Sequence, residues 1–202
     1  MLIYIHGFNS APNSFKARLI GERMRALGRD NEYLVPALPH RPTEAIALLR
    51  DLVERHPGAA LIGSSLGGYY ATWLAEHYGL RVALVNPAAQ PYQLLSGYLG
   101  SQKNIYTGAA YELTAQHIDE LRALEVATVT PANYYLLTRT GDEVLDYRLA
   151  VEKFRGAQQW VIPGGDHGFG DFANYVDAVL AFCGVSQPAA PAPSKPIGNS
   201  VG

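Results

Sequence analysis

ALIGSSLGGYY, residues 60–70, joins a short apolar run, an abrupt turn and the start of a helical pattern. The apolar run predicts a strand, and the pattern that continues to Tyr78 predicts a helix, so Ser65 lies at the corner between them. Glycines at positions 63 and 67 leave room for the strand and the helix to approach each other. The Ser65 hydroxyl would then stand above the sheet; the alternative is a serine that only caps the helix.

The composition is that of one soluble domain. Of the 202 residues, 48% are hydrophobic and 17% are charged, and the formal net charge is −2. The lack of any Lys/Arg cluster predicts no nucleic-acid partner. No segment approaches the roughly 20 apolar residues that a membrane span requires, so we expect no membrane span. Cys183 is the only cysteine, which excludes an intrachain disulfide and a cysteine-based metal cluster. We expect a cytoplasmic protein.

Strand and helix patterns alternate along the chain. Apolar runs predict strands over residues 2–5, 33–35, 59–62, 81–85, 133–137 and 159–162, with helical patterns between them and from residue 171 onwards. The alternation predicts an α/β fold, with a mostly parallel sheet of about six strands and helices on both faces. In the order 2-1-3-4-5-6, the first and third strands are neighbours where the order reverses, so Gly7 and Phe8 would lie beside Ser65.

The sequence predicts one domain over residues 1–185. Within it, residues 91–131 are too long for a plain crossover and are predicted to form an insertion over the sheet, with a helix over 114–124. This insertion is a candidate lid. Residues 186–202 are rich in Pro and Ala with few large apolar side chains, which predicts a disordered tail.

Groups suited to acid–base chemistry follow the predicted strands. A serine nucleophile needs a base, and His167, in a glycine-rich loop after the sixth strand, can accept and return a proton near neutral pH. A carboxylate on its other ring nitrogen would hold the required tautomer. Asp142, after the fifth strand, is the preferred carboxylate, and Asp146 is the alternative; Glu143 is expected to point elsewhere if Asp142 points towards the histidine. A surface histidine is the alternative interpretation of His167.

Main-chain amides beside Ser65 are predicted to form an oxyanion hole. The Leu66 N–H lies at the helix N-terminus, and the Phe8 N–H follows Gly7, which would let the main chain approach a substrate. Of the other polar residues, His6 is expected to shape this loop, Asp166 to shape the His167 loop, and His117 to be solvated. Asn86 is expected to be a turn residue before Pro87; the alternative is that it orients the nearby loops.

The start of the insertion offers substrate contacts. Tyr92, Leu95 and Tyr98 are candidates, together with Gly7 and Phe8. The alternative for the three insertion residues is that they pack the segment onto the sheet.

Five segments together resemble the YqiA-type esterases of the α/β-hydrolase superfamily. They are YIHGFNS (4–10), GSSLGGYYATW (63–73), VNPA (85–88), TGDEVLDY (140–147) and GGDH (164–167). The resemblance implies a compact α/β-hydrolase fold and a serine carboxylic-ester hydrolase. In it Ser65 is the nucleophile, His167 the base and Asp142 the acid, with no metal or organic cofactor. Small-molecule acyl esters and acyl thioesters both fit as substrates, and the oligomeric state is left open.

Two other functions remain open at this point. A hydrolase-derived protein could bind a small ligand with little turnover. A peptidase or C–C hydrolase would use the same three side chains on a different bond.

Overall fold

The computed structural model describes residues 1–185, so the predicted disordered tail, 186–202, lies outside the described residues. Six strands form one parallel sheet in the order β2-β1-β3-β4-β7-β8. The six strands pair in the order that the sequence predicts, 2-1-3-4-5-6. Their labels differ only because two strands of a separate small sheet come between the fourth and fifth strands along the chain. The main-sheet strands are β1 (Leu2–Ile5), β2 (Tyr33–Leu34), β3 (Ala60–Ser64), β4 (Val82–Val85), β7 (Tyr134–Arg139) and β8 (Gln158–Ile162).

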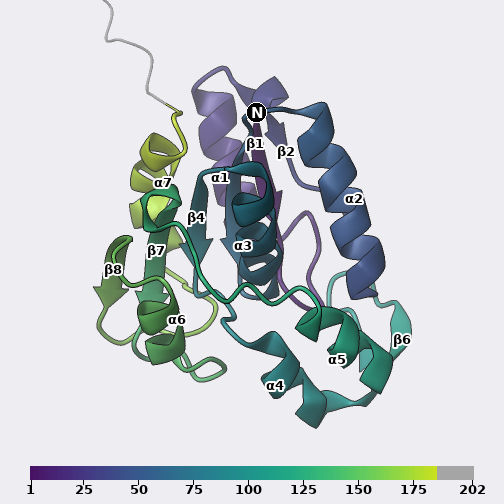
Figure 1. Cartoon of the computed structure of the whole chain (residues 1–202). Helices are drawn as coiled ribbons and strands as arrows, with labels where there is room; N and C mark the ends of the chain where they lie inside the picture. Colours follow the sequence, from purple (N-terminus) through teal and green to yellow (C-terminus); the bar gives the residue numbers. More distant parts are fainter. Residues whose placement is uncertain (186–202) are drawn as a thin grey trace, which may run out of the picture.

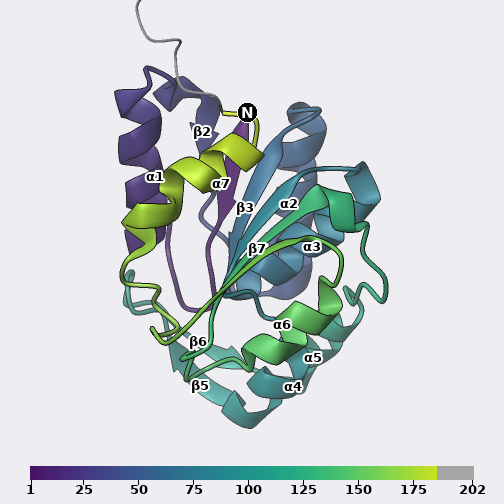
Figure 2. The ribbon, with the colours of Figure 1, turned by 90° about the vertical axis from the view of Figure 1, so that its left-hand side faces the viewer.

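Helices cover both faces of this sheet (Figures 1 and 2). One face carries α1 (Phe15–Ala26) and α7 (Val176–Phe182). The other carries α2 (Pro42–Arg55), α3 (Leu66–Tyr78) and α6 (Tyr147–Lys153). Short 3-10 helices, η1 (Asp30–Glu32), η3 (Pro131–Asn133) and η4 (Phe172–Tyr175), adjoin β2, β7 and α7.

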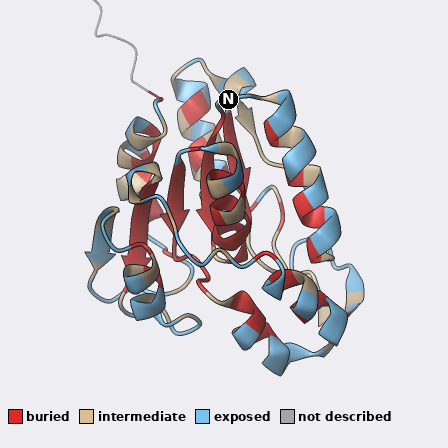
Figure 3. Ribbon diagram, viewed as in Figure 1, coloured by how far each residue is buried: buried red, intermediate tan, exposed pale blue. Residues whose placement is uncertain are grey.

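The four inner strands, β1, β3, β4 and β7, are buried on both faces, because they lie between two helical layers, whereas the edge strand β8 is largely exposed (Figure 3). Alternate side chains of β1 show the two cores: Ile3 and Ile5 pack with α2 and α3, whereas Leu2 and Tyr4 pack with α1 and α7. All four are at most 1% exposed. The continuous apolar runs of the sequence are explained by this two-sided burial.

The order of the strands reverses between β1 and β3. These two strands are neighbours, with Ile5 opposite Gly63, and the chain leaves both at the same edge of the sheet. The loop after β1 therefore lies beside the turn after β3, as the sequence predicts. This edge carries the polar residues that were expected to meet.

Residues 91–131 lie at the carboxyl end of the strands (Figures 1 and 2). The expected helix is present as α5 (Ala115–Arg122). The sequence did not predict α4 (Pro91–Leu95), η2 (Ser96–Tyr98) or the antiparallel pair β5 (Gly100–Lys103) and β6 (Ala110–Leu113). β5 reads Gly-Ser-Gln-Lys, which has no apolar alternation to mark a strand. Among the described residues, no helix is long and apolar enough to cross a membrane.

Candidate active site

Ser65 lies in the turn between β3 and α3, in a strained main-chain conformation. Its φ of 54° and ψ of −124° are unusual for a residue with a side chain. The glycines around it are required by close contacts: a Cβ at Gly67 would lie 2.0 Å from the Ile5 carbonyl oxygen, and one at Gly63 would lie 2.6 Å from the Gly68 Cα. The predicted glycine-flanked turn is confirmed.

His167 contacts both Ser65 and Asp142. Its Nε2 lies 3.1 Å from the Ser65 Oγ, and its Nδ1 lies 2.8 Å from the Asp142 Oδ2. An ionised carboxylate only accepts hydrogen bonds, so Nδ1 carries the proton of the neutral ring and Nε2 accepts from the serine hydroxyl. The Asp142 side chain is 1% exposed, whereas that of His167 is 23% exposed. The arrangement keeps the carboxylate away from water and leaves the imidazole accessible.

The carboxylate of Asp142 is held by main-chain donors. Its Oδ1 accepts from the Val144 N–H at 2.9 Å and from the Leu145 N–H at 2.8 Å, so its other oxygen is directed at His167. Asp146 does not compete for this place, because it caps α6 by accepting from the Arg148 N–H at 3.0 Å. Asp142 is the carboxylate in contact with the imidazole.

Glu143 has a different contact with the histidine loop. Its Oε2 accepts from the His167 main-chain N–H at 3.0 Å. Asp166 accepts from the Phe169 N–H at 2.8 Å, which fits its expected role in shaping the loop. Both carboxylates hold the main chain of this loop, and neither contacts the His167 ring by a hydrogen bond.

Asn86 connects β4, β7 and the histidine loop. Its Nδ2 donates to the carbonyls of Asp166 and His167, both at 3.1 Å, and its Oδ1 accepts from the Arg139 N–H at 2.9 Å. The residue is 1% exposed and has a φ of 41°. The favoured prediction, a simple turn residue, is wrong, because the side chain is buried between three segments; the alternative, that Asn86 orients the nearby loops, agrees with these hydrogen bonds. An Asn directly before a proline at a strand end was the available signal.

The main-chain amides of Phe8 and Leu66 lie beside the serine. A Cβ added at Gly7 would be 3.0 Å from the Ser65 Cβ, which shows how closely this loop passes the serine. Within residues 1–185, neither the Phe8 nor the Leu66 N–H donates to another protein group. Both N–H groups are thus free to donate at the sheet edge that carries Ser65 and His167.

His6 holds the loop that carries Gly7 and Phe8. Its Nε2 accepts from the Leu38 N–H at 3.3 Å, so the proton is on Nδ1, which donates to the Gly7 carbonyl at 3.1 Å. Burial lowers the pKa of His6, because the charged ring would lose its hydration. The structure agrees with the expected loop-shaping role.

An apolar cavity of about 220 Å³ opens on one side of Ser65. Leu95 and Tyr98 of the insertion line it, together with Phe8. Tyr92 does not line it: the residue is 6% exposed, and its hydroxyl donates to Glu125 at 2.7 Å. The expected substrate contact of Tyr92 is therefore corrected to a packing role, because its ring is turned into the core.

A larger and more polar cavity, of about 620 Å³, adjoins the same serine. It is lined by Gly7, Ser65 and His167, by the start of α1, and by residues 105 and 106 between β5 and β6. The two cavities share Phe8, Ser65 and His167, so the serine has open space on two sides. Apolar side chains line both cavities, and the larger one also contains the polar groups of Ser14, Lys16 and Asp166.

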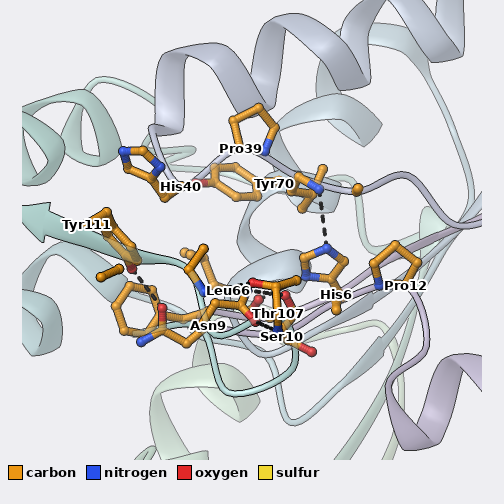
Figure 4. A pocket seen from close by; sticks show the side chains of 18 residues that line it. His6, Asn9, Ser10, Pro12, Pro39, His40, Leu66, Tyr70, Thr107 and Tyr111 are labelled. Atoms are coloured by element: carbon orange, nitrogen blue, oxygen red, sulfur yellow. Dashed lines mark hydrogen bonds between the residues drawn. The ribbon is translucent and has the colours of Figure 1, made fainter. Parts of the chain in front are cut away.

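A third cavity, of about 250 Å³, adjoins the loop after β1 (Figure 4). Its walls include His6, His40 and Tyr111, and the last two rings stack with centroids 4.4 Å apart. His117, expected to be solvated, is 8% exposed, because its Nδ1 accepts from the Thr114 N–H in the capping box of α5. Among residues 1–185, no group of three or more His, Cys, Asp or Glu side chains could hold a metal ion.

Comparisons with known proteins agree with this architecture. A family model described as an uncharacterised protein family, UPF0227, matches residues 1–184. Est1E from Butyrivibrio proteoclasticus superposes with a TM-score of 0.68 at 16% identity, over 90% of this chain and 85% of that one. The esterase domain of a Rhodothermus marinus protein gives 0.65 at 18% identity, over 90% and 85%. Mouse alpha/beta hydrolase domain-containing protein 10 gives 0.63 at 16%, over 91% and 87%. The chain therefore has the α/β-hydrolase fold.

Proposed function

We propose that this chain, which belongs to the uncharacterised protein family UPF0227, is a serine hydrolase that cleaves carboxylic esters. The family match confirms the resemblance to YqiA-type proteins. The bond cleaved is an acyl ester or acyl thioester of a small molecule. The observation that carries the proposal is the continuous chain of contacts from Asp142 through His167 to Ser65.

The reaction proceeds in two displacements. The Ser65 hydroxyl attacks the substrate carbonyl while His167 Nε2 takes its proton, and the negative oxygen that forms is bound by the N–H groups of Phe8 and Leu66. His167 then gives the proton to the departing alcohol or thiol, leaving an acyl group on Ser65. Water, deprotonated by the same imidazole, hydrolyses this acyl-enzyme and regenerates the serine.

Asp142 supports this sequence without accepting the proton. Its Oδ2 holds the Nδ1–H tautomer of His167 and stabilises the imidazolium that forms in each displacement. The strained φ of Ser65 places its hydroxyl at the corner between strand and helix, where the amide of Leu66 is adjacent. Phe8, Leu95 and Tyr98, which line the apolar cavity, would contact the acyl group.

The test is covalent labelling combined with turnover. Folded wild-type protein should react with a fluorophosphonate at Ser65, as located by peptide mass spectrometry, and should hydrolyse a graded series of aryl esters and acyl thioesters. Ser65→Ala should lose both reactions. Ser101→Ala, which changes an exposed serine of β5, is the matched control and should keep them. Labelling elsewhere, or turnover that survives Ser65→Ala, would show that the proposal is wrong.

The same experiment separates the rival functions. A binding protein with little turnover would bind ligands without a catalytic burst and would not depend on the Ser65 hydroxyl. A peptidase or C–C hydrolase would be labelled at Ser65 but would be inactive on the whole ester series.

A further inference from the structure

We infer that the polar cavity beside Ser65 binds an anionic group, a carboxylate or a phosphate, on the leaving-group side of the substrate, through Lys16 and Ser14. This inference rests on the proposed esterase function and narrows it. The substrate would be the ester or thioester of an apolar acid with an alcohol or thiol that carries a negative charge.

The cavity places a cation and the nucleophile in one space. Lys16, in the first turn of α1, lines the 620 Å³ cavity that Ser65 and His167 also line. Its ammonium donates to the Gly168 carbonyl at 2.7 Å, one residue after the imidazole that would protonate the leaving group. A group bound at Lys16 is thus in the same cavity as the bond that breaks.

The ammonium of Lys16 has more N–H donors than its contact with Gly168 uses. It carries three N–H bonds, and within residues 1–185 no carboxylate forms a salt bridge with it. Burial lowers the pKa of Lys16 to about 8, while the charges of Asp166 and Asp142 act in the opposite direction. The side chain is therefore mostly protonated at neutral pH. A partly desolvated, unpaired cation is a good site for an anion.

Ser14 gives a second, independent indication. It lines the same cavity and is 8% exposed, and no hydrogen bond of ordinary length joins its Oγ to a group within residues 1–185; its polar neighbour is the Tyr4 hydroxyl, which lines the same cavity. Buried hydroxyls are normally hydrogen-bonded, because an unpaired one has lost its water without a replacement. The oxygens of a carboxylate or phosphate could accept from the Ser14 hydroxyl and the Lys16 ammonium together.

One carboxylate lines the same cavity and would oppose an anion. Asp166 is exposed, and its Oδ1 already accepts from the Phe169 N–H at 2.8 Å. Its repulsion is therefore reduced by solvent and by salt, whereas the contacts at Lys16 and Ser14 are direct. The direct contacts at Lys16 and Ser14 therefore outweigh this repulsion.

The two cavities differ in the parts of the substrate that they suit. His167 lines both cavities, but only the polar cavity also has Asp166, Gly168 and Gly170 of the His167 loop in its wall, so we place the leaving group on this side. The smaller cavity has Leu94 and Leu95 in its wall and suits an apolar acyl chain. This division assigns the anionic group to the leaving side.

The test compares charged and neutral esters that differ in one group. 4-Acetoxybenzoate and its methyl ester differ in charge on the leaving group; phenyl hydrogen adipate and phenyl methyl adipate differ in charge on the acyl group. For each pair, the ratio of kcat/KM (anionic over neutral) is measured in wild type, Lys16→Met, Lys16→Arg, Ser14→Ala and Arg18→Met. Arg18→Met removes one positive charge from an exposed position on the same helix and is the matched control.

For the ester pair that differs in charge on the leaving group, we expect the kcat/KM ratio to fall at least about tenfold in Lys16→Met and a few-fold in Ser14→Ala. The ratio should recover in Lys16→Arg and should not change in Arg18→Met. A structural role through Gly168 alone would lower the turnover of both esters and leave the ratio unchanged, which would overturn the inference. A change confined to the acyl-charged pair would overturn it as well. If neutral-ester turnover also survives Ser65→Ala, the proposed function itself fails.

Discussion

The side chain of Asn86 donates a hydrogen bond to the main-chain carbonyl of His167, across 81 residues of sequence and a distance of 3.1 Å. The residue that follows β4 thereby holds the loop that carries the imidazole. Its oxygen accepts from the Arg139 N–H, so the end of β7, three residues before Asp142, is tied to the same side chain. One buried amide connects the segments of two proposed catalytic residues.

Removing this amide should misplace His167. In Asn86→Ala the Arg139 N–H and two loop carbonyls lose a buried partner, which should cost about 2–4 kcal/mol of unfolding free energy. Because the imidazole is no longer held, kcat on an aryl ester should fall about 10- to 100-fold with little change in KM. Urea unfolding and steady-state kinetics measure the two effects. Unchanged kcat in a folded variant would show that the loop is positioned without Asn86.

Asp142→Asn should reduce kcat by about 10³- to 10⁴-fold while the protein stays folded. The reason is the tautomer: an amide can donate to Nδ1, which moves the ring proton to Nε2 and removes the acceptor for the Ser65 hydroxyl. Asp146→Asn is the matched control, since Asp146 caps α6 and pairs with Arg148. Steady-state turnover of one aryl ester compares them; a larger loss in Asp146→Asn would reverse the assignment of the acid.

Gly67→Ala should destabilise the fold strongly. The added Cβ would lie 2.0 Å from the Ile5 carbonyl oxygen and 2.6 Å from that of His6, both main-chain atoms that cannot move freely. We expect a loss of about 3 kcal/mol or more of unfolding free energy. Gly97→Ala is the control, because nothing lies within 4 Å of a Cβ at that position. Thermal melts that show equal stability for the two variants would contradict the tight packing of the Ser65 turn.

The pH dependence of stability should carry a contribution from His6. Burial lowers its pKa in the folded protein, so the unfolded chain, with an ordinary value near 6.5, takes up the proton first as pH falls. The stability that His6 contributes is complete above about pH 6.5 and is lost below it. His117, whose pKa burial also lowers, acts in the same direction.

His6→Gln should therefore show a smaller drop in unfolding free energy between pH 7 and pH 5 than wild type, because the variant has no buried ring that must stay neutral. Denaturant titrations at a series of pH values measure this difference. His56→Gln, at the partly exposed end of α2, serves as the control. An equal drop in His6→Gln and wild type would mean that the ring is not kept neutral by burial.

Local sequence patterns were sufficient to predict much of the fold and part of the candidate site. The apolar runs and the glycines around Ser65 predicted the strands, the turn and the fold class. A strand buried on both faces requires consecutive apolar residues, and a crowded turn requires glycine. Asp142 and His167 were predicted from their places after strands, since parallel strands end at one edge of the sheet. The pair β5 and β6 escaped prediction because Leu113 is its only buried residue, which leaves no apolar alternation in the sequence.

Other features were decided only by the tertiary structure. The buried amide of Asn86 and the inward ring of Tyr92 depend on contacts between segments that are distant in the chain. Lys16 is an ordinary first-turn lysine in the sequence, yet it contacts Gly168, 152 residues away. Periodicity reports whether a side chain faces the core, whereas only packing of the whole chain determines which polar groups meet there.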